Sequence, residues 1–507
     1  MRNNPLLKHL LLVLSFALLF SSGHIENPDS QLRLTQARVL VETGSLEIPQ
    51  GFGDVTHGNI ALTKSGKQYS VYNPGQVLLF VPFYWLAQYI PTQWHPYYVA
   101  AFLCSFLGYL TFGSIVLVFW EIGKKLGVPE RSRVVATLLF AATSFCFAHA
   151  QDSYEHIYEA LFVLLAVCQL LPTTKRYEPV VWAALAIGCG LLFRTSAVIV
   201  LPGILALMPT WRQRGLFLLS LLPFAGILLA YNYLRFDDPF QNGYASAWAL
   251  AFHQTAASSF KLSTLPKHLL GLLFSSAKGL IFFSPSVMLA GIGYRSFWRY
   301  QPRLAIGVVL IAGAYLGFYA ANFAWHGSAW NWGPRYIVPA VPLLYLTLFY
   351  LPAMRHRSVI AVVASLSLVV QVLAVSTFHK RTLVKTFLKE GDIFWSDAYF
   401  FNPRYSPLVG QVTSLYEVTR SMVAGSPKEL FLPEGPWRNE ARPVSSQVML
   451  DSSIDFTVYN FWWVRLLYLK VSTGIKLLGL GAAAIASLLL FNQFTRLWSR
   501  THAERIG

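Results

Sequence analysis

The sequence predicts an all-α, polytopic membrane protein with about twelve transmembrane helices and a long first outer loop. Of its 507 residues, 55% are hydrophobic and only 12% are charged, and the mean hydropathy is +0.47. A soluble domain carries roughly 25% charged residues, so this chain has too few to cover a water-facing surface. Apolar runs of roughly 17–25 residues recur along its length, each long enough to cross hydrocarbon as a helix.

The formal net charge of +17 would point to nucleic acid in a soluble protein. Here Lys and Arg concentrate in short loops between apolar runs, as the positive-inside rule describes. We therefore expect membrane lipids and no nucleic acid as partners. The four cysteines lie inside apolar runs without metal-ligand spacing, and we interpret them as small core residues: Cys104, Cys146, Cys168 and Cys189.

The apolar runs divide the chain into spans separated by basic loops. We expect spans at residues 6–22, 97–120, 134–150, 156–172, 179–193, 195–209, 215–234, 280–294, 304–324, 336–352, 358–377 and 472–493. With the N-terminus inside, every basic loop between these spans faces the cytoplasm, and so does the tail. Both termini are therefore expected in the cytoplasm. A cleaved signal peptide over the first run is the alternative.

Two apolar runs are not counted as spans, because including either would invert the later loops. Residues 75–91 carry several prolines, and we predict a membrane-surface or re-entrant segment. Residues 266–279 are predicted to form a surface helix. The run 179–209 is too long for one span, and a single helix would hold Arg194 near mid-bilayer, so we divide it there.

These assignments divide the chain into three parts. Residues 1–377 form a transmembrane module that includes the outer loop 23–96, and residues 378–471 form a small extracytoplasmic segment. Residues 472–507 supply the last span and its cytoplasmic tail. No internal repeat is visible, which weakens the interpretation as an inverted-repeat transporter.

Acidic side chains gather in two places on the predicted outer face. Glu26 and Asp29 begin the first outer loop, where a partly desolvated carboxylate is a better proton acceptor. Asp152, Glu155 and His156 form an outer turn, and Glu159 lies one helical turn further on. An acid inside a span is costly and indicates a site. The alternatives are a solvated loop acid and an exposed turn that caps a helix.

Three cations lie at outer helix ends and at the same predicted depth, namely Arg194, Lys278 and Arg335. Arginine binds phosphate with a forked, bidentate geometry. The alternative for a single cation is snorkelling to lipid headgroups. Three cations that face acids on the same side favour an anion site, and we predict a lipid-phosphate substrate whose phosphate is held at the interface.

Six short stretches follow one another over residues 1–410. They are Asp29-Ser30-Gln31 with Arg33; Tyr72-Asn73-Pro74-Gly75-Gln76; Arg235-Phe236-Asp237-Asp238-Pro239; Lys278-Gly279-Leu280 with Ser284-Pro285; Trp332-Gly333-Pro334-Arg335-Tyr336; and Tyr405-Ser406-Pro407-Leu408. Together they resemble the multi-spanning glycosyltransferases of the GT-C class, specifically bacterial relatives of the protein O-mannosyltransferases and of the lipid A aminoarabinose transferase (family 39-like).

The resemblance implies a polyprenyl-phosphate-sugar donor and a lipid, glycan or protein acceptor on the outer face of a bacterial inner membrane. It also implies that Asp29 is the catalytic residue. Relatives often carry a second acid in this outer loop, where the candidates here are Asp54 and Asn59. Because an Asn cannot act as a base, acid pairing and a divalent metal at this place are left open.

The resulting hypothesis is an inverting transfer in which Asp29 accepts the proton of the acceptor hydroxyl. Arg335, with Lys278 or Arg194, would stabilise the charge on the departing phosphate. The remaining candidates would orient hydroxyl groups: Glu26, Asp54, Asp152, Glu155 and His156. The rival hypothesis is a transporter or lipid flippase for an envelope glycolipid, which needs ionisable groups near mid-membrane.

Overall fold

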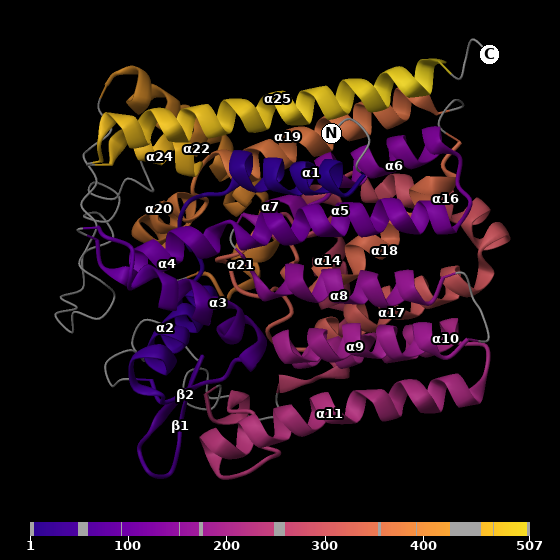
Figure 1. The fold of residues 1–507 in the computed structure, drawn as a ribbon, viewed down its shortest axis with the longest axis horizontal. Helices are drawn as coiled ribbons and strands as arrows, with labels where there is room; N and C mark the ends of the chain where they lie inside the picture. The colour runs from indigo at the N-terminus through magenta and orange to yellow at the C-terminus, as the bar shows by residue number, and fades with distance from the viewer. Residues whose placement is uncertain are drawn as a thin grey trace.

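The structure, a computed structural model, describes residues 5–48, 59–92, 94–151, 153–171, 176–247, 259–352, 356–391, 393–425, 458–469 and 471–503. Helices dominate these residues, with one two-stranded hairpin (Figure 1).

The elements of the first half are α1 (Pro5–Phe20), α2 (Pro28–Thr43), β1 (Ile60–Leu62), β2 (Gln68–Ser70), α3 (Pro74–Ala87), α4 (Pro96–Ser105), α5 (Leu107–Lys125), α6 (Glu130–Thr143), α7 (Cys146–Ala150), α8 (Glu155–Gln169), α9 (Glu178–Phe193), the 3-10 helix η2 (Thr195–Val200), α10 (Leu201–Leu207) and α11 (Trp211–Phe236). Those of the second half are η3 (Leu262–Thr264), α14 (Leu265–Phe274), α15 (Leu280–Phe283), α16 (Val287–Tyr300), α17 (Pro302–Ala321), η4 (Arg335–Ala340), α18 (Val341–Tyr345), η5 (Leu346–Tyr350), α19 (Arg357–Ser376), α20 (Lys380–Glu390), α21 (Asp397–Phe401), η6 (Pro403–Tyr405), α22 (Pro407–Val423), α24 (Trp462–Tyr468) and α25 (Thr473–Ala503).

Each predicted span coincides with one helix or with a run of successive helices. Within the described residues, 5 helices are long and apolar enough to cross a membrane: Pro96–Lys125, Trp211–Phe236, Pro302–Ala321, Arg357–Ser376 and Thr473–Gln493. Shorter apolar helices lie at Lys8–Phe20, Pro74–Ala87, Glu178–Phe193, Thr195–Leu207 and Arg335–Tyr350. The all-α, polytopic prediction is therefore confirmed, whereas the number of spans and the side on which each terminus lies stay predictions.

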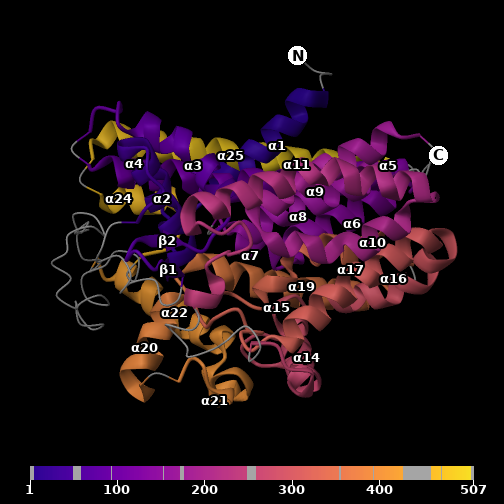
Figure 2. The same ribbon diagram turned by 90° about the horizontal axis from the view of Figure 1, so that it is seen from below.

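The long helices run side by side, and α2, α3, α4 and the hairpin gather at one end of them (Figure 1). At opposite edges of this view, α11 and α25 present leucines outward, such as Leu219 at 63% and Leu478 at 74% exposure. Such apolar outer faces are what lipid contact requires. Figure 2 shows α14, α20 and α21 gathered along one edge of the molecule.

Several predicted spans are broken, and the breaks follow local sequence. α9 ends at Phe193 and Arg194 is extended (φ −156°, ψ 125°), as the costly mid-bilayer position of its charge predicts. The run 280–294 breaks after Phe283, because Pro285 cannot continue a helix hydrogen-bond ladder. The predicted surface segments correspond to α3 and α14, and their place in a membrane stays a prediction.

Residues 458–463, just before and at the start of α24, contact the end of α1 and the segment that follows it. The Trp462 indole donates to Leu18 O at 2.6 Å and the Trp463 indole donates to Leu19 O at 3.0 Å. The Asn460 amide donates to Glu26 and to Gln151 Oε1, the latter at 3.1 Å. This closure holds the segment that precedes α2, around Glu26. The division into three parts stays a prediction.

Candidate active site

The candidate site lies where α2, α8 and η4 begin close to one another. α2 is capped by Asn27, whose side chain accepts a hydrogen bond from the Ser30 amide at 2.7 Å, and Pro28 follows the cap. This cap places Asp29 in the first helical turn, where the helix dipole stabilises a carboxylate. Arg33 follows four residues later on the same helix face.

Asp29 forms an ion pair with Arg335. Its Oδ2 lies 2.8 Å from Arg335 Nη1, and its Oδ1 accepts a hydrogen bond from Asn59 Nδ2 at 3.2 Å. Both side chains of the ion pair are 12% exposed, so solvent still reaches them. The structure thus brings together the predicted base, the predicted phosphate ligand and Asn59.

A second set of ion pairs lies next to the first and centres on Glu155. One carboxylate oxygen lies 2.7 Å from Arg194 Nη1 and the other lies 3.1 Å from Arg33 Nη1. Glu159 extends the set, because its carboxylate lies 3.9 Å from Arg194 Nε and accepts a hydrogen bond from the Tyr315 hydroxyl at 2.5 Å. Both glutamates are buried, so these partners are needed to offset the loss of hydration.

Tyrosine rings separate the three guanidinium groups of the site. The Arg33 guanidinium lies 3.6 Å from the centre of the Tyr72 ring. The Arg194 and Arg335 guanidinium groups each lie 5.1 Å from the centre of the Tyr336 ring. A ring face attracts each cation and keeps like charges apart, so the site can hold three arginines.

Buried polar atoms at the site have unused hydrogen-bonding capacity. Those without a hydrogen-bond partner in the described part of the chain are Arg33 Nε, Tyr72 Oη, both ring nitrogens of His156, Trp332 Nε1 and Arg335 Nε. Burial, with the Asp29 charge, holds the pKa of Tyr72 well above its usual range, so its hydroxyl remains a donor. Unsatisfied buried groups are costly, and this set suits a ligand rich in hydroxyl and phosphate oxygens.

Lys278 lies deeper than Arg335 and is fully buried. Its ammonium donates to the backbone oxygen of Asn331 at 2.6 Å. Burial, followed by the Arg335 charge, holds the pKa of Lys278 well below its usual range. The structure therefore connects Lys278 to the loop that precedes Arg335, and its contact with a phosphate stays a prediction.

The other predicted site residues fall in different places. His156 is fully buried at the start of α8, and its Nδ1 lies 3.8 Å from Glu155 Oε1. Glu26 is buried beside the site, where its Oε1 lies 3.4 Å from His24 Nε2. Asp54 and Asp152 lie outside the described residues, so their orienting roles stay predictions.

The Tyr-Asn-Pro-Gly-Gln stretch positions two of these elements. Gln76 Nε2 donates to Ser153 O at 2.6 Å and so fixes the turn before α8. Asn73 Nδ2 donates to Leu191 O at 2.8 Å, just before the break at Arg194. Gly75 lies against the same break, where a Cβ would come within 2.7 Å of Leu192 O. The stretch therefore fixes the position of the start of α8 relative to the end of α9.

Sequence reasoning missed Arg33, Tyr72 and Asn331 as site residues. Arg33 had a usable signal, because its i, i+4 spacing from Asp29 puts both side chains on one face of a helix. Tyr72 is placed by the hairpin, since Val71 N donates to Asn59 O at 3.0 Å beyond the paired strands. No sequence signal marked Asn331, because its contacts depend on tertiary packing.

The described residues contain no group of three or more His, Cys, Asp and Glu side chains arranged to hold a metal ion. A metal there stays a prediction, because Asp54 lies outside these ranges. Asn59 gives a direct test of acid pairing at Asp29.

Asn59→Asp would place a second carboxylate about 3 Å from Asp29, and the repulsion raises the pKa of one of the two acids. We expect transfer activity at pH 7 to fall and to become sensitive to added Mg²⁺ or Mn²⁺, since paired carboxylates are ligands for these ions. The assay compares metal titrations for wild type, Asn59→Asp and the uncharged control Asn59→Ala. Identical metal responses in all three would contradict the pairing of positions 29 and 59.

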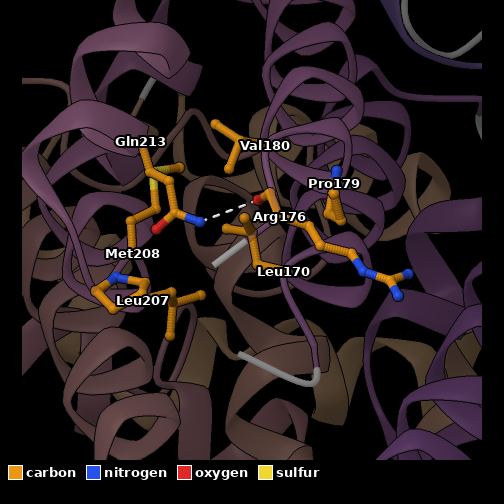
Figure 3. Close-up of a pocket in the computed structure, with 8 residues that line it drawn as sticks. Leu170, Arg176, Pro179, Val180, Leu207, Met208 and Gln213 are labelled. Atoms are coloured by element: carbon orange, nitrogen blue, oxygen red, sulfur yellow. Dashed lines mark hydrogen bonds between the residues drawn. The ribbon is translucent and has the colours of Figure 1, made fainter. Parts of the chain in front are cut away.

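A cavity at the other end of α8 is too small for a sugar. Gln213 Nε2 donates to Arg176 O at 3.0 Å beside it (Figure 3). Its volume of about 10 Å³ corresponds to roughly one water molecule. A second cavity of about 20 Å³ adjoins the site at Tyr154 and Trp332. Neither cavity is large enough to hold a sugar, so the charged cluster remains the candidate substrate site.

No protein-family model matches the sequence, and no curated protein sequence matches it. Two solved structures of ArnT from Cupriavidus metallidurans are similar to this chain. The structure with bound undecaprenyl phosphate has 12% identity and a TM-score of 0.46, over 84% of this chain and 82% of that chain. The apo structure has 14% identity and a TM-score of 0.45, over 82% of this chain and 68% of that chain.

Proposed function

We propose that this protein is a membrane glycosyltransferase that moves a sugar from a polyprenyl-phosphate donor to an acceptor on the extracytoplasmic face. The observation that carries the proposal is the Asp29–Arg335 ion pair at 2.8 Å. It brings together a group able to accept a proton and a group able to bind phosphate.

The charges around the ion pair support a donor that carries phosphate. Three guanidinium groups, those of Arg33, Arg194 and Arg335, pair with three carboxylates, those of Asp29, Glu155 and Glu159. A donor phosphate can take the place of one carboxylate beside these arginines. When the sugar leaves, the phosphate gains a second charge, and the arginines stabilise that change more than they stabilise the bound donor.

In the proposed reaction, the donor phosphate replaces Asp29 as the partner of Arg335 Nη1. Asp29 Oδ2 is then free to accept the proton of the acceptor hydroxyl. The acceptor oxygen forms a bond to the anomeric carbon, and the bond from that carbon to the phosphate oxygen breaks. The electron pair of the broken bond stays on the phosphate, so polyprenyl phosphate leaves as an anion next to the guanidinium groups.

Under this proposal, the hydroxyl groups of the sugar face side chains that can donate or accept hydrogen bonds. Tyr72 Oη and both ring nitrogens of His156 have no hydrogen-bond partner among the described residues. A polar site rejects analogues that leave such groups unpaired. The same residues therefore provide discrimination between sugars.

The test is transfer from a panel of polyprenyl-phosphate sugars by the purified full chain in detergent, with mass spectrometry of cell-envelope glycans made with and without the gene. We expect release of polyprenyl phosphate together with one modified envelope glycan. A transporter or flippase forms no glycosidic bond, so it would transfer no sugar to an acceptor in this assay. Loss of glycan modification without any transfer in vitro would favour that alternative.

A further inference from the structure

Asn331 lies in the loop between α17 and η4 and is 1% exposed. Its side-chain oxygen accepts hydrogen bonds from the Tyr154 hydroxyl and, at 3.4 Å, from Arg335 Nη1. Its side-chain nitrogen donates to Gly327 O. The amide orientation is therefore fixed, because the nitrogen faces a carbonyl and the oxygen faces two donors.

The backbone of Asn331 is also held. Its carbonyl oxygen accepts the hydrogen bond from Lys278 Nζ at 2.6 Å, and Lys278 is fully buried. A buried ammonium is costly to leave without acceptors, so this contact fixes the loop strongly. Lys278 thereby acts on the loop that precedes Arg335, although Lys278 itself lies in the turn between α14 and α15.

These contacts converge on the orientation of one guanidinium group. Arg335 Nη1 is shared between Asp29 Oδ2 at 2.8 Å and Asn331 Oδ1 at 3.4 Å. The same guanidinium lies 5.6 Å from the centre of the Tyr154 ring, which Asn331 also holds. Gly327 leaves room for this position of the Arg335 side chain, because a Cβ there would come within 2.8 Å of Arg335 Cγ.

We propose that Asn331 is a positioning residue that aims Arg335 at the donor phosphate and is itself held in place by Lys278. The inference rests on the proposed function and adds a role for two residues behind the phosphate ligand. A forked guanidinium binds a phosphate well only at a fixed angle, so a support that restricts rotation affects donor binding and transfer together.

The test is a double-mutant cycle with Arg335. Asn331→Ala alone is expected to lower kcat/KM by roughly 10–100-fold, the usual cost of losing a group that orients a ligand-binding side chain. In the Arg335→Ala background the same change is expected to cost less than about threefold, because its target is gone. Lys278→Met is expected to follow the same pattern. A Lys278 that contacts the phosphate directly would instead weaken donor binding in both backgrounds.

Asn322→Ala is the matched control, since Asn322 is a buried amide in the same loop that accepts from Ala324 N at 2.8 Å. Its effect is expected to be equal with and without Arg335. Equal, additive losses for Asn331→Ala in both backgrounds would overturn the inference. Absence of transfer by the wild-type chain would instead overturn the proposed function.

A cryo-EM structure of Asn331→Ala in nanodiscs tests the positioning without an activity assay. We expect the Arg335 guanidinium to move out of hydrogen-bond range of Asp29 Oδ2, beyond roughly 3.5 Å. An Arg335 that stays paired with Asp29 as in the wild type would overturn the inference, whatever the activity of the variant.

Discussion

Asp29→Asn is expected to lower turnover by roughly 10²–10⁴, the usual contribution of a positioned base. The substitution keeps the size of the side chain and its place in the first turn of α2, but it removes the proton acceptor. Donor affinity should change little, because the arginines that pair with phosphate remain. The measurement is transfer from a polyprenyl-phosphate sugar in detergent, with donor binding measured separately.

The control for this experiment is Asp397→Asn, because Asp397 is exposed and pairs with Lys267 far from the site in the chain. It should leave both turnover and donor affinity unchanged. Wild-type turnover in Asp29→Asn would remove Asp29 from the mechanism. The base would then be sought at Asp54 or Asp152.

Arg335→Ala should weaken donor binding and slow transfer by roughly 10²–10³, the usual effect of removing one group that stabilises a developing oxyanion. The loss in turnover arises because the phosphate gains charge as it separates from the sugar. Arg335→Lys should rescue only part of the loss, since an ammonium lacks the bidentate fork. Donor dissociation constants and single-turnover rates measure the two effects separately.

Arg404→Ala is the matched control, because this arginine is exposed and pairs with Glu390 at the end of α20. Its removal should alter neither donor binding nor transfer. Unchanged donor binding in Arg335→Ala would show that the phosphate is held elsewhere, with Arg194 and Arg33 as the remaining candidates.

Hydropathy and charge were sufficient to place the helices, because both depend on short stretches of sequence. The break at Arg194 follows from one charge in a long apolar run, and the structure has it there. Motif order was sufficient to select Asp29 and Arg335, which lie 306 residues apart in the chain and form an ion pair. Local signals therefore identified the two central groups of the candidate site.

Pairing between elements was not predictable. The sequence could not show that Glu155 joins Arg33 and Arg194, because such contacts depend on how α2, α8 and the end of α9 pack. The same holds for Lys278, which was predicted as a phosphate ligand and donates to Asn331 O in the structure. A charge at a helix end has many partners within reach, and only the packed structure selects one.

The closure of residues 458–463 onto the loop before α2 has a consequence for biogenesis. Asn460 and Glu26 lie 434 residues apart, and Glu26 is three residues before Asp29. A ribosome releases the N-terminal helices first. A nascent chain therefore contains Asp29 and the loop before α2 long before it contains Asn460, whose amide contacts Glu26. Contacts of such long range form late. The loop therefore acquires its final set of contacts only near the end of translation, and an incomplete chain cannot hold the candidate base as the finished protein does.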